Sequence, residues 1–299
     1  MTADDFLPVN IPQDRLRNLV KEFGTSMKFD SGTTKHVYLK AVDRLIAYAD
    51  SVPFSFTPGD FSQFRLWLLN QEKLRTNTVN TYLTGSRRFC EFLVESKVLS
   101  KNPAWSFHGT AQTYKVFGAK LSEIMRAVSG IDRSTIIGKR DHAFLTLILE
   151  SGATISELIN ADIGDLKSNN KKVELWVRPK AARGRFEVIT LTRQASQVLS
   201  EYVNARGPVL GDHPLFGTVR AGKVTTVRLS LRGVRAAMQK HLRLGAEKRL
   251  RLDSLRTYCA VKLMNQGRTL EEIREFMRFK SNVPFKKIIT NSKAIAGIR

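Results

Sequence analysis

Candidate functional residues are concentrated in three short segments, residues 152–158, 253–257 and 267–273. In the second of these, Arg256 lies between Asp253 and Thr257. A guanidinium can donate two parallel hydrogen bonds to a phosphate, so Arg256 is the residue best suited to grip one. The alternative is a buried ion pair with Asp253 or Glu157, which would use the same charge inside the protein. The chemistry expected here is phosphate binding, which the nearby aspartate would oppose.

The formal charge of +22 over 299 residues is concentrated in the later part of the chain. Residues 1–110 hold 14 Lys and Arg against 11 Asp and Glu, whereas residues 111–299 hold 35 against 16. A region this basic favours an anionic polymer as its partner, and nucleic acid is the commonest one. We therefore expect double-stranded DNA as the partner.

Other composition features exclude several classes of protein. Cys90 and Cys259 lie in apolar helical patterns, so a reduced, cytoplasmic protein without disulfides is expected. The five histidines show no ligand spacing, so we expect no metal and no other cofactor. No apolar run approaches the ~20 residues that span a bilayer, and the acidic start does not resemble a secretory signal. A membrane partner is not expected.

Residues 1–108 predict a small helical domain. Apolar residues recur at three and four between residues 31 and 50, a second helix runs through residues 61–69, and a third opens near residue 77. The third helix turns Asn80, Thr84 and Arg87 away from its apolar side. These side chains could contact DNA phosphates or simply form a solvated face.

Residues 109–118 predict a linker, and residues 119–299 predict a second, mainly helical domain with a small antiparallel sheet. The sheet is expected from the alternating residues 173–177 and the β-prone run 186–191. The turn between them is basic and could follow a phosphate backbone or enter a minor groove, unless it is basic only for solubility. Its three cations are Lys180, Arg183 and Arg185.

A second basic cluster follows the predicted sheet. Between residues 218 and 251, ten basic residues accompany one acid. Arg228, Arg232 and Arg235 follow spacings of four and three, which predicts three guanidinium groups on one face of a helix. They could grip guanine edges or phosphates, and the alternative is a merely solvated basic helix.

The order and spacing of these segments resemble the tyrosine recombinase (phage integrase) family over roughly residues 30–290. Residues 77–104 are similar to its helical core-binding (SAM-like) domain, and residues 140–166 and 253–288 to the two ends of its catalytic domain. The resemblance implies a mainly α fold with a small antiparallel β-sheet, whose two domains form a C-shaped clamp on DNA. It also implies that the helix expected at residues 228–235 lies in the major groove.

Family members clamp the scissile phosphate with two arginines, use a hairpin lysine and two histidines (or a histidine and a tryptophan), and attack with a tyrosine. Arg256 matches the second arginine, and Lys180 can be matched to the lysine. The other positions differ here: they are Thr154 for the first arginine, Asp253, Thr257 and Phe279 for the histidine-type positions, and Ile288 for the tyrosine. No tyrosine follows Tyr258, so a shift of register cannot supply the nucleophile.

The resemblance therefore implies a catalytically degenerate member, a pseudo-recombinase rather than an enzyme. Each lost group commonly contributes about 100-fold to 10,000-fold, so losing several together predicts no strand cleavage. The expected function is sequence-specific binding of double-stranded DNA, as a transcriptional regulator or repressor of a phage or mobile element. Such a protein would be prokaryotic or phage-encoded and associated with the nucleoid. Arg278, where the family has a glycine, could add a phosphate contact.

Two alternatives remain open at this point. The chain could be an accessory or architectural subunit that assists an active recombinase. It could also be an active recombinase with a relocated nucleophile, Tyr202 or Tyr258, although Tyr258 lies in an apolar helix and is expected in the core. Only 11 residues follow Ile288, so we expect an altered assembly such as a homodimer on DNA.

Overall fold

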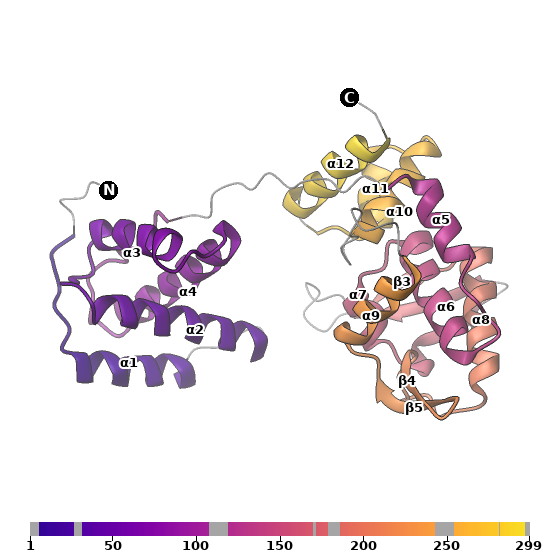
Figure 1. Ribbon diagram of the computed structural model, residues 1–299, viewed down its shortest axis with the longest axis horizontal. Helices are drawn as coiled ribbons and strands as arrows, with labels where there is room; N and C mark the ends of the chain where they lie inside the picture. Colours follow the sequence, from indigo (N-terminus) through magenta and orange to yellow (C-terminus); the bar gives the residue numbers. More distant parts are fainter. Residues whose placement is uncertain are drawn as a thin grey trace. The chain divides into compact units, whose positions relative to one another are not determined.

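The computed structural model describes residues 6–26, 32–107, 119–169, 172–178, 186–242, 254–280 and 282–296. The chain divides into two compact units, Met1–Tyr114 and Lys115–Arg299 (Figure 1). The division falls within the predicted linker, residues 109–118, which lies outside the described residues. Four predicted site residues also lie outside them: Lys180, Arg183, Arg185 and Asp253.

The described part of the first unit is helical. Its helices are α1 (Gln13–Ser26), α2 (Gly32–Ala49), α3 (Pro58–Asn70) and α4 (Thr76–Glu95). The three predicted helices are confirmed, and α1 was not predicted. Helices α2 and α4 pack closely because Gly85 has no side chain: a Cβ there would lie 2.5 Å from the Ala41 Cβ. Phenylalanines fill much of the core, so the unit has a hydrophobic interior of its own.

The second unit is mainly helical with two small antiparallel sheets, which confirms the predicted fold class. Helix α6 lies at its centre and packs against α8 and α10 (Figure 1). The helices of this unit are α5 (Leu121–Ser129), α6 (Ile136–Ser151), α7 (Ile155–Asn160), α8 (Arg193–Arg206), α9 (Leu231–His241), α10 (Ser254–Asn265), α11 (Leu270–Phe276) and α12 (Asn282–Ala296).

The predicted hairpin is part of a three-stranded sheet in the order β1-β2-β3. Strand β2 (Lys172–Val177) pairs with both β1 (Leu166–Asn169) and β3 (Glu187–Thr190), with Trp176 opposite Val188. A second hairpin, β4 (Gly217–Arg220) with β5 (Lys223–Arg228), was not predicted.

The second hairpin corrects one prediction about the basic cluster. Arg228 is the last residue of β5 and does not lie on the helix that carries Arg232 and Arg235. That helix, α9, begins only at Leu231 because Ser230 caps it: the Ser230 Oγ accepts a hydrogen bond from the Gly233 amide at 3.1 Å. The spacing of four and three therefore spans a strand end and a helix, not one helical face.

Cys90 and Cys259 are free cysteines, and both are buried, as their apolar patterns predicted.

None of the helices among the described residues is both long and apolar enough to cross a bilayer.

Candidate functional site

Thr154 stands at the start of α7, where the resemblance places the first arginine. Its Oγ1 accepts a hydrogen bond from the Glu157 amide at 3.1 Å, and the Glu157 carboxylate accepts one from the Thr154 amide at 2.7 Å. The two residues thus form a reciprocal capping box. The spacing Thr-x-x-Glu is a sequence signature of such a box, and it was not used above to predict the start of this helix. Thr154 therefore caps a helix and offers a phosphate no charge.

Arg256, on α10, is half-buried and held by the turn that precedes α7. Its Nε donates a hydrogen bond to the Gly152 carbonyl at 2.8 Å, and its Nη2 donates one to the Met277 carbonyl at 2.7 Å. The guanidinium also stacks on the ring of Phe279, 4.5 Å from the centroid. Glu157, one of the two ion-pair partners that the alternative interpretation gave to Arg256, pairs with another arginine. Asp253, the second of the two, lies outside the described residues, so that part of the alternative stays a prediction.

That other arginine is Arg278. Its Nη2 lies 3.0 Å from the Glu157 carboxylate, and its Nη1 donates to the carbonyls of Ser151 and Phe276 at 3.3 and 3.2 Å. Its side chain is only 11% exposed, and its Nε lies 3.9 Å from the Glu187 carboxylate. Its backbone has φ of 57°, in the region that favours the glycine the family has there. Most of its donors are therefore used inside the protein.

Three of the other positions matched to the family's catalytic residues lie among the described residues, and packing holds each of them. Phe279 presents its ring to Arg256 and lies 5.5 Å from the ring of Phe285. Ile288, where the tyrosine is expected, packs half-buried in the small core between α10, α11 and α12. Thr257 is buried, and its carbonyl accepts a hydrogen bond from Ser292. The structure thus brings Thr154, Arg256, Arg278 and Phe279 together around the Gly152 turn.

Neither candidate for a relocated nucleophile is placed to react. The Tyr258 hydroxyl is buried and donates to the Ala119 carbonyl at 2.9 Å, and burial raises its pKa to about 12. The Tyr202 hydroxyl is also buried, donates to the Leu215 carbonyl at 3.1 Å, and has a pKa raised mainly by burial. The core position predicted for Tyr258 is confirmed.

Comparison with known proteins tests the resemblance directly. Residues 119–283, more than half of the chain, match the phage integrase family, and residues 19–98 match the phage integrase N-terminal SAM-like domain. This chain belongs to the phage integrase family.

Relatives cover most of the chain. A tyrosine recombinase XerC of Syntrophus aciditrophicus is 25% identical over 287 residues, covering 88% of this chain and 89% of the relative. One of Pelotomaculum thermopropionicum is 25% identical over 241 residues, covering 75% and 74%.

Solved structures share the fold. A XerH site-specific recombinase in a post-cleavage complex with difH substrate has a TM-score of 0.67 at 12% identity, covering 94% of this chain and 81% of that one. A lambda integrase dimer bound to a COC' core site has a TM-score of 0.66 at 12% identity, covering 91% and 93%.

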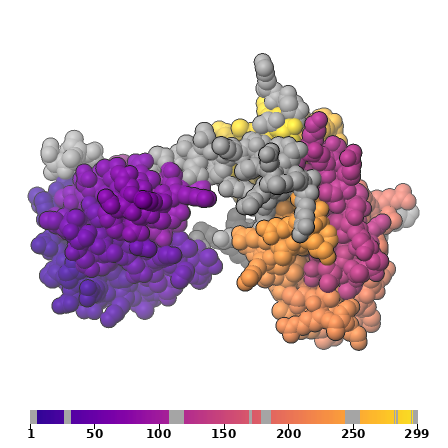
Figure 2. Space-filling model, viewed as in Figure 1, coloured from indigo at the N-terminus to yellow at the C-terminus, as the bar shows by residue number. Residues whose placement is uncertain are grey.

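The exposed face of α9 differs from the cluster of residues around the Gly152 turn. Arg232 and Arg235 are exposed, and among the described residues neither has a hydrogen bond or an ion pair. Ala236 and Gln239 are also exposed on this helix. The orange surface that includes β4, β5 and α9 forms part of the outside of the second unit (Figure 2). This face offers free cations to a polyanion.

The polar residues predicted on α4 are half-buried. The Thr84 hydroxyl donates to the Asn80 carbonyl at 2.8 Å, and Arg87 lies 3.9 Å from the Glu91 carboxylate. The nearby Asn102 donates to the Arg87 carbonyl and accepts from the Ala104 amide, so residues 102–104 are joined to the backbone of α4. Asn80 and Thr84 lie on one helix face, and their role in DNA contact stays a prediction.

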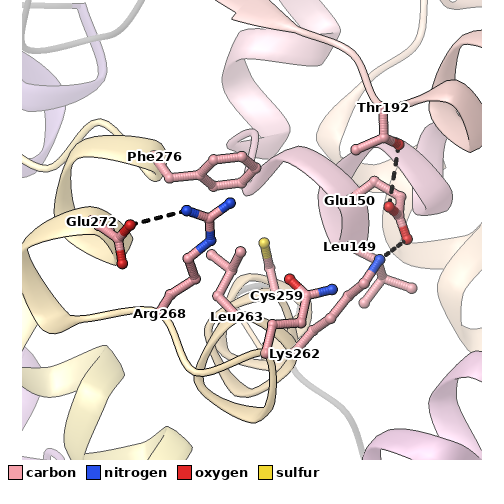
Figure 3. Close-up of a pocket in the computed structure, with 10 residues that line it drawn as sticks. Leu149, Glu150, Thr192, Cys259, Lys262, Leu263, Arg268, Glu272 and Phe276 are labelled. Carbon is pink, nitrogen blue, oxygen red and sulfur yellow. Dashed lines mark hydrogen bonds and ion pairs between the residues drawn. The ribbon is translucent and has the colours of Figure 1, made fainter.

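A separate cavity of about 300 Å³ lies between α6, α10 and α11 (Figure 3). Its charged groups are paired: Lys262 with the buried Glu150, and Arg268 with Glu272 at 2.9 Å. The Glu150 carboxylate also accepts from the Thr192 hydroxyl. Burial raises the pKa of the Cys259 thiol at its wall to about 12, so that sulfur is a poor nucleophile. From the sequence, the cavity was not predicted, although Cys259 and the segment 267–273, which holds Arg268 and Glu272, were named there.

Proposed function

We propose that this member of the phage integrase family binds double-stranded DNA sequence-specifically and does not cut it. The observation that carries the proposal is the fate of the two arginines at the Gly152 turn. Arg256 donates to two backbone carbonyls and Arg278 pairs with Glu157, while threonine and isoleucine occupy the positions expected for an arginine and a tyrosine. Among the described residues, this cluster offers no free nucleophile and few free donors for a reacting phosphate.

The cationic surface supports the binding half of the proposal. Arg232 and Arg235 are exposed and free of partners among the described residues, and arginines on one helix face suit both phosphates and guanine edges. The solved XerH and lambda integrase structures hold DNA, and we extend that property to this chain. We further propose a role as a transcriptional regulator, most simply a repressor in a phage or mobile element.

A second candidate function is an accessory subunit for an active recombinase. This candidate is supported by the 25% identity of the chain to tyrosine recombinases named XerC. Dependence on a partner separates the two: an accessory subunit is required for recombination by an active enzyme, whereas a repressor acts without one. Co-purification with an active recombinase, together with loss of recombination when the chain is deleted, would decide for the accessory role.

The binding test begins with selection of bound duplexes from a random library, followed by titration at two salt concentrations. We expect a selected site to bind at least ~1,000-fold more tightly than unrelated duplex, with affinity falling steeply as salt rises. Equal binding of all duplexes would reject sequence-specific function.

The cleavage test uses the selected site with a nick that traps covalent intermediates. We expect no protein–DNA adduct on denaturing gels, with an active XerC as positive control. An adduct that disappears in Tyr202→Phe or Tyr258→Phe would instead establish a relocated nucleophile.

A further inference from the structure

Arg228 ends strand β5, and its guanidinium donates three hydrogen bonds to one short segment. Its Nη1 donates to the carbonyls of Ile159 and Ala161 at 2.9 and 3.0 Å. Its Nη2 donates to the Asp162 carboxylate at 2.6 Å. The three partners are consecutive or nearly so in sequence, so a single side chain grips the whole turn that follows α7.

The two carbonyls belong to the end of α7, where backbone acceptors lack partners within the helix. The Ala161 carbonyl also accepts from the Leu215 amide at 2.8 Å, and the Ile163 amide donates to His213. The turn after α7 is therefore joined to residues 211–215 as well as to Arg228. Arg228 completes this junction by donating to the Ile159 carbonyl and by adding a second donor to the Ala161 carbonyl.

Arg228 is also next to the start of α9. Leu229 is buried and its amide donates to the Phe216 carbonyl at 2.8 Å, and Ser230 then caps the helix. Only two residues separate the Arg228 anchor from the first residue of α9, Leu231. The direction in which α9 leaves the hairpin is thus tied to the end of α7.

We propose that Arg228, together with Asp162, is a positioning residue that sets the direction of α9 so that Arg232 and Arg235 meet DNA in one register. The inference rests on the proposed DNA-binding function. It reassigns Arg228 from a DNA contact to a residue that acts through α9. Its Nη1 and Nη2 already donate to partners, in contrast to Arg232 and Arg235, which have none among the described residues.

The Arg228 side chain is 36% exposed, so the competing assignment is a direct phosphate contact. Asp162 separates the two assignments by the sign of its effect. If Arg228 contacts phosphate, removing the Asp162 carboxylate frees a cation and removes a repulsive charge, so all duplexes bind more tightly. If Arg228 positions α9, the same change weakens binding of the selected site.

The experiment measures Asp162→Ala and Arg228→Ala on the selected site and on unrelated duplex over a range of salt. We expect each variant to lose roughly tenfold in discrimination between the two duplexes, with the double variant no worse than Arg228→Ala alone. The salt slope of Arg228→Ala should stay within about 0.4 of the wild-type value. Glu201→Gln, which removes an exposed carboxylate on α8 paired with Lys139, is the charge-matched control and should retain discrimination.

The contrary result is a salt slope reduced by about 0.9 in Arg228→Ala, equal losses on both duplexes, and tighter binding by Asp162→Ala. That pattern would make Arg228 a phosphate contact and overturn the inference. Asp162→Asn, which keeps an oxygen acceptor for Nη2, should restore most of the discrimination lost in Asp162→Ala. Thermal melting confirms that each variant is folded.

Hydrogen exchange gives a readout that needs no DNA. Amides in the first turns of α9, such as those of Val234 and Arg235, should exchange at least threefold faster in Arg228→Ala than in the wild type. Unchanged exchange would overturn the positioning role even in a folded variant. If the wild type fails to select any duplex, the proposed function fails, while the exchange result still decides whether Arg228 orders α9.

Discussion

The second unit contains two pairs of arginines that have opposite surroundings. Arg256 and Arg278 lie at the Gly152 turn. Arg256 donates hydrogen bonds to backbone carbonyls, and Arg278 pairs with the Glu157 carboxylate. Arg232 and Arg235 lie exposed on α9 without partners among the described residues. Both pairs add to the same net charge. We infer from this difference that basic charge alone does not identify a DNA-contacting residue, and that the availability of free guanidinium donors is the better guide.

The two pairs should therefore affect different properties of the protein. Arginines that cap carbonyls and neutralise a buried carboxylate contribute to the free energy of unfolding. Arginines that are free contribute to the affinity for a polyanion and to its dependence on salt. Substituting one pair at a time tests whether the two pairs affect these two properties separately.

The largest expected effect comes from Arg278→Ala. The Glu157 carboxylate is only 4% exposed, and losing its partner would leave a buried charge uncompensated. We expect the free energy of unfolding to fall by about 3–5 kcal/mol, measured by urea denaturation. Lys280→Ala is the control, because Lys280 also contacts Glu187 but is 62% exposed, and its loss should cost less than about 1 kcal/mol. Equal losses in both variants would contradict the buried role of Arg278.

Arg256→Ala should have the next largest effect. It removes two charged hydrogen bonds and the stacking on Phe279, so we expect a loss of about 2–3 kcal/mol in the free energy of unfolding. Arg268→Ala, which breaks an exposed pair with Glu272, serves as control and should cost less than about 0.5 kcal/mol. The assigned difference between the two arginine pairs would be wrong if Arg256→Ala kept the wild-type free energy of unfolding but bound DNA more weakly and with a smaller dependence on salt.

The sequence predicted the helices and the first sheet because hydrophobic spacing is a local property. It did not predict β4 and β5, whose burial shows no alternation between an apolar and an exposed face, and so it placed Arg228 on a helix. It named the residues around the Gly152 turn through their resemblance to the family. It could not show that Arg278 pairs with Glu157, since that contact joins residues 121 positions apart. Charge partners of this kind depend on tertiary packing, which spacing does not contain.

The α9 pair should show the reverse behaviour. We expect Arg232→Ala and Arg235→Ala to leave the free energy of unfolding within about 0.5 kcal/mol of the wild type. Each should weaken binding of the selected duplex by about 1–3 kcal/mol if it reads a base, or lower the salt slope by about 0.9 if it contacts a phosphate. Gel-shift titrations with the double variant measure both. Normal binding by the double variant would place the DNA contact elsewhere on the unit.

The smallest effect extends the comparison to a buried group with a ring nitrogen that has no hydrogen-bond partner. His142, on α6, is 7% exposed and its Nδ1 has no hydrogen-bond partner. Its pKa is lowered, chiefly by burial and next by the nearby Arg133. The unfolded chain therefore binds a proton more readily, so stability is full above about pH 6.5 and is lost as the pH falls below it.

A single group of this kind limits the slope to about 1.4 kcal/mol per pH unit. His142→Gln should flatten the fall in the free energy of unfolding between about pH 6.5 and 5.5, measured by urea denaturation. Parallel curves for the wild type and the variant would show that His142 accepts a proton in the folded state without cost. In that case a buried cation would be tolerated inside the unit, and the cost of burying charge would not account for the internal partners of Arg256 and Arg278.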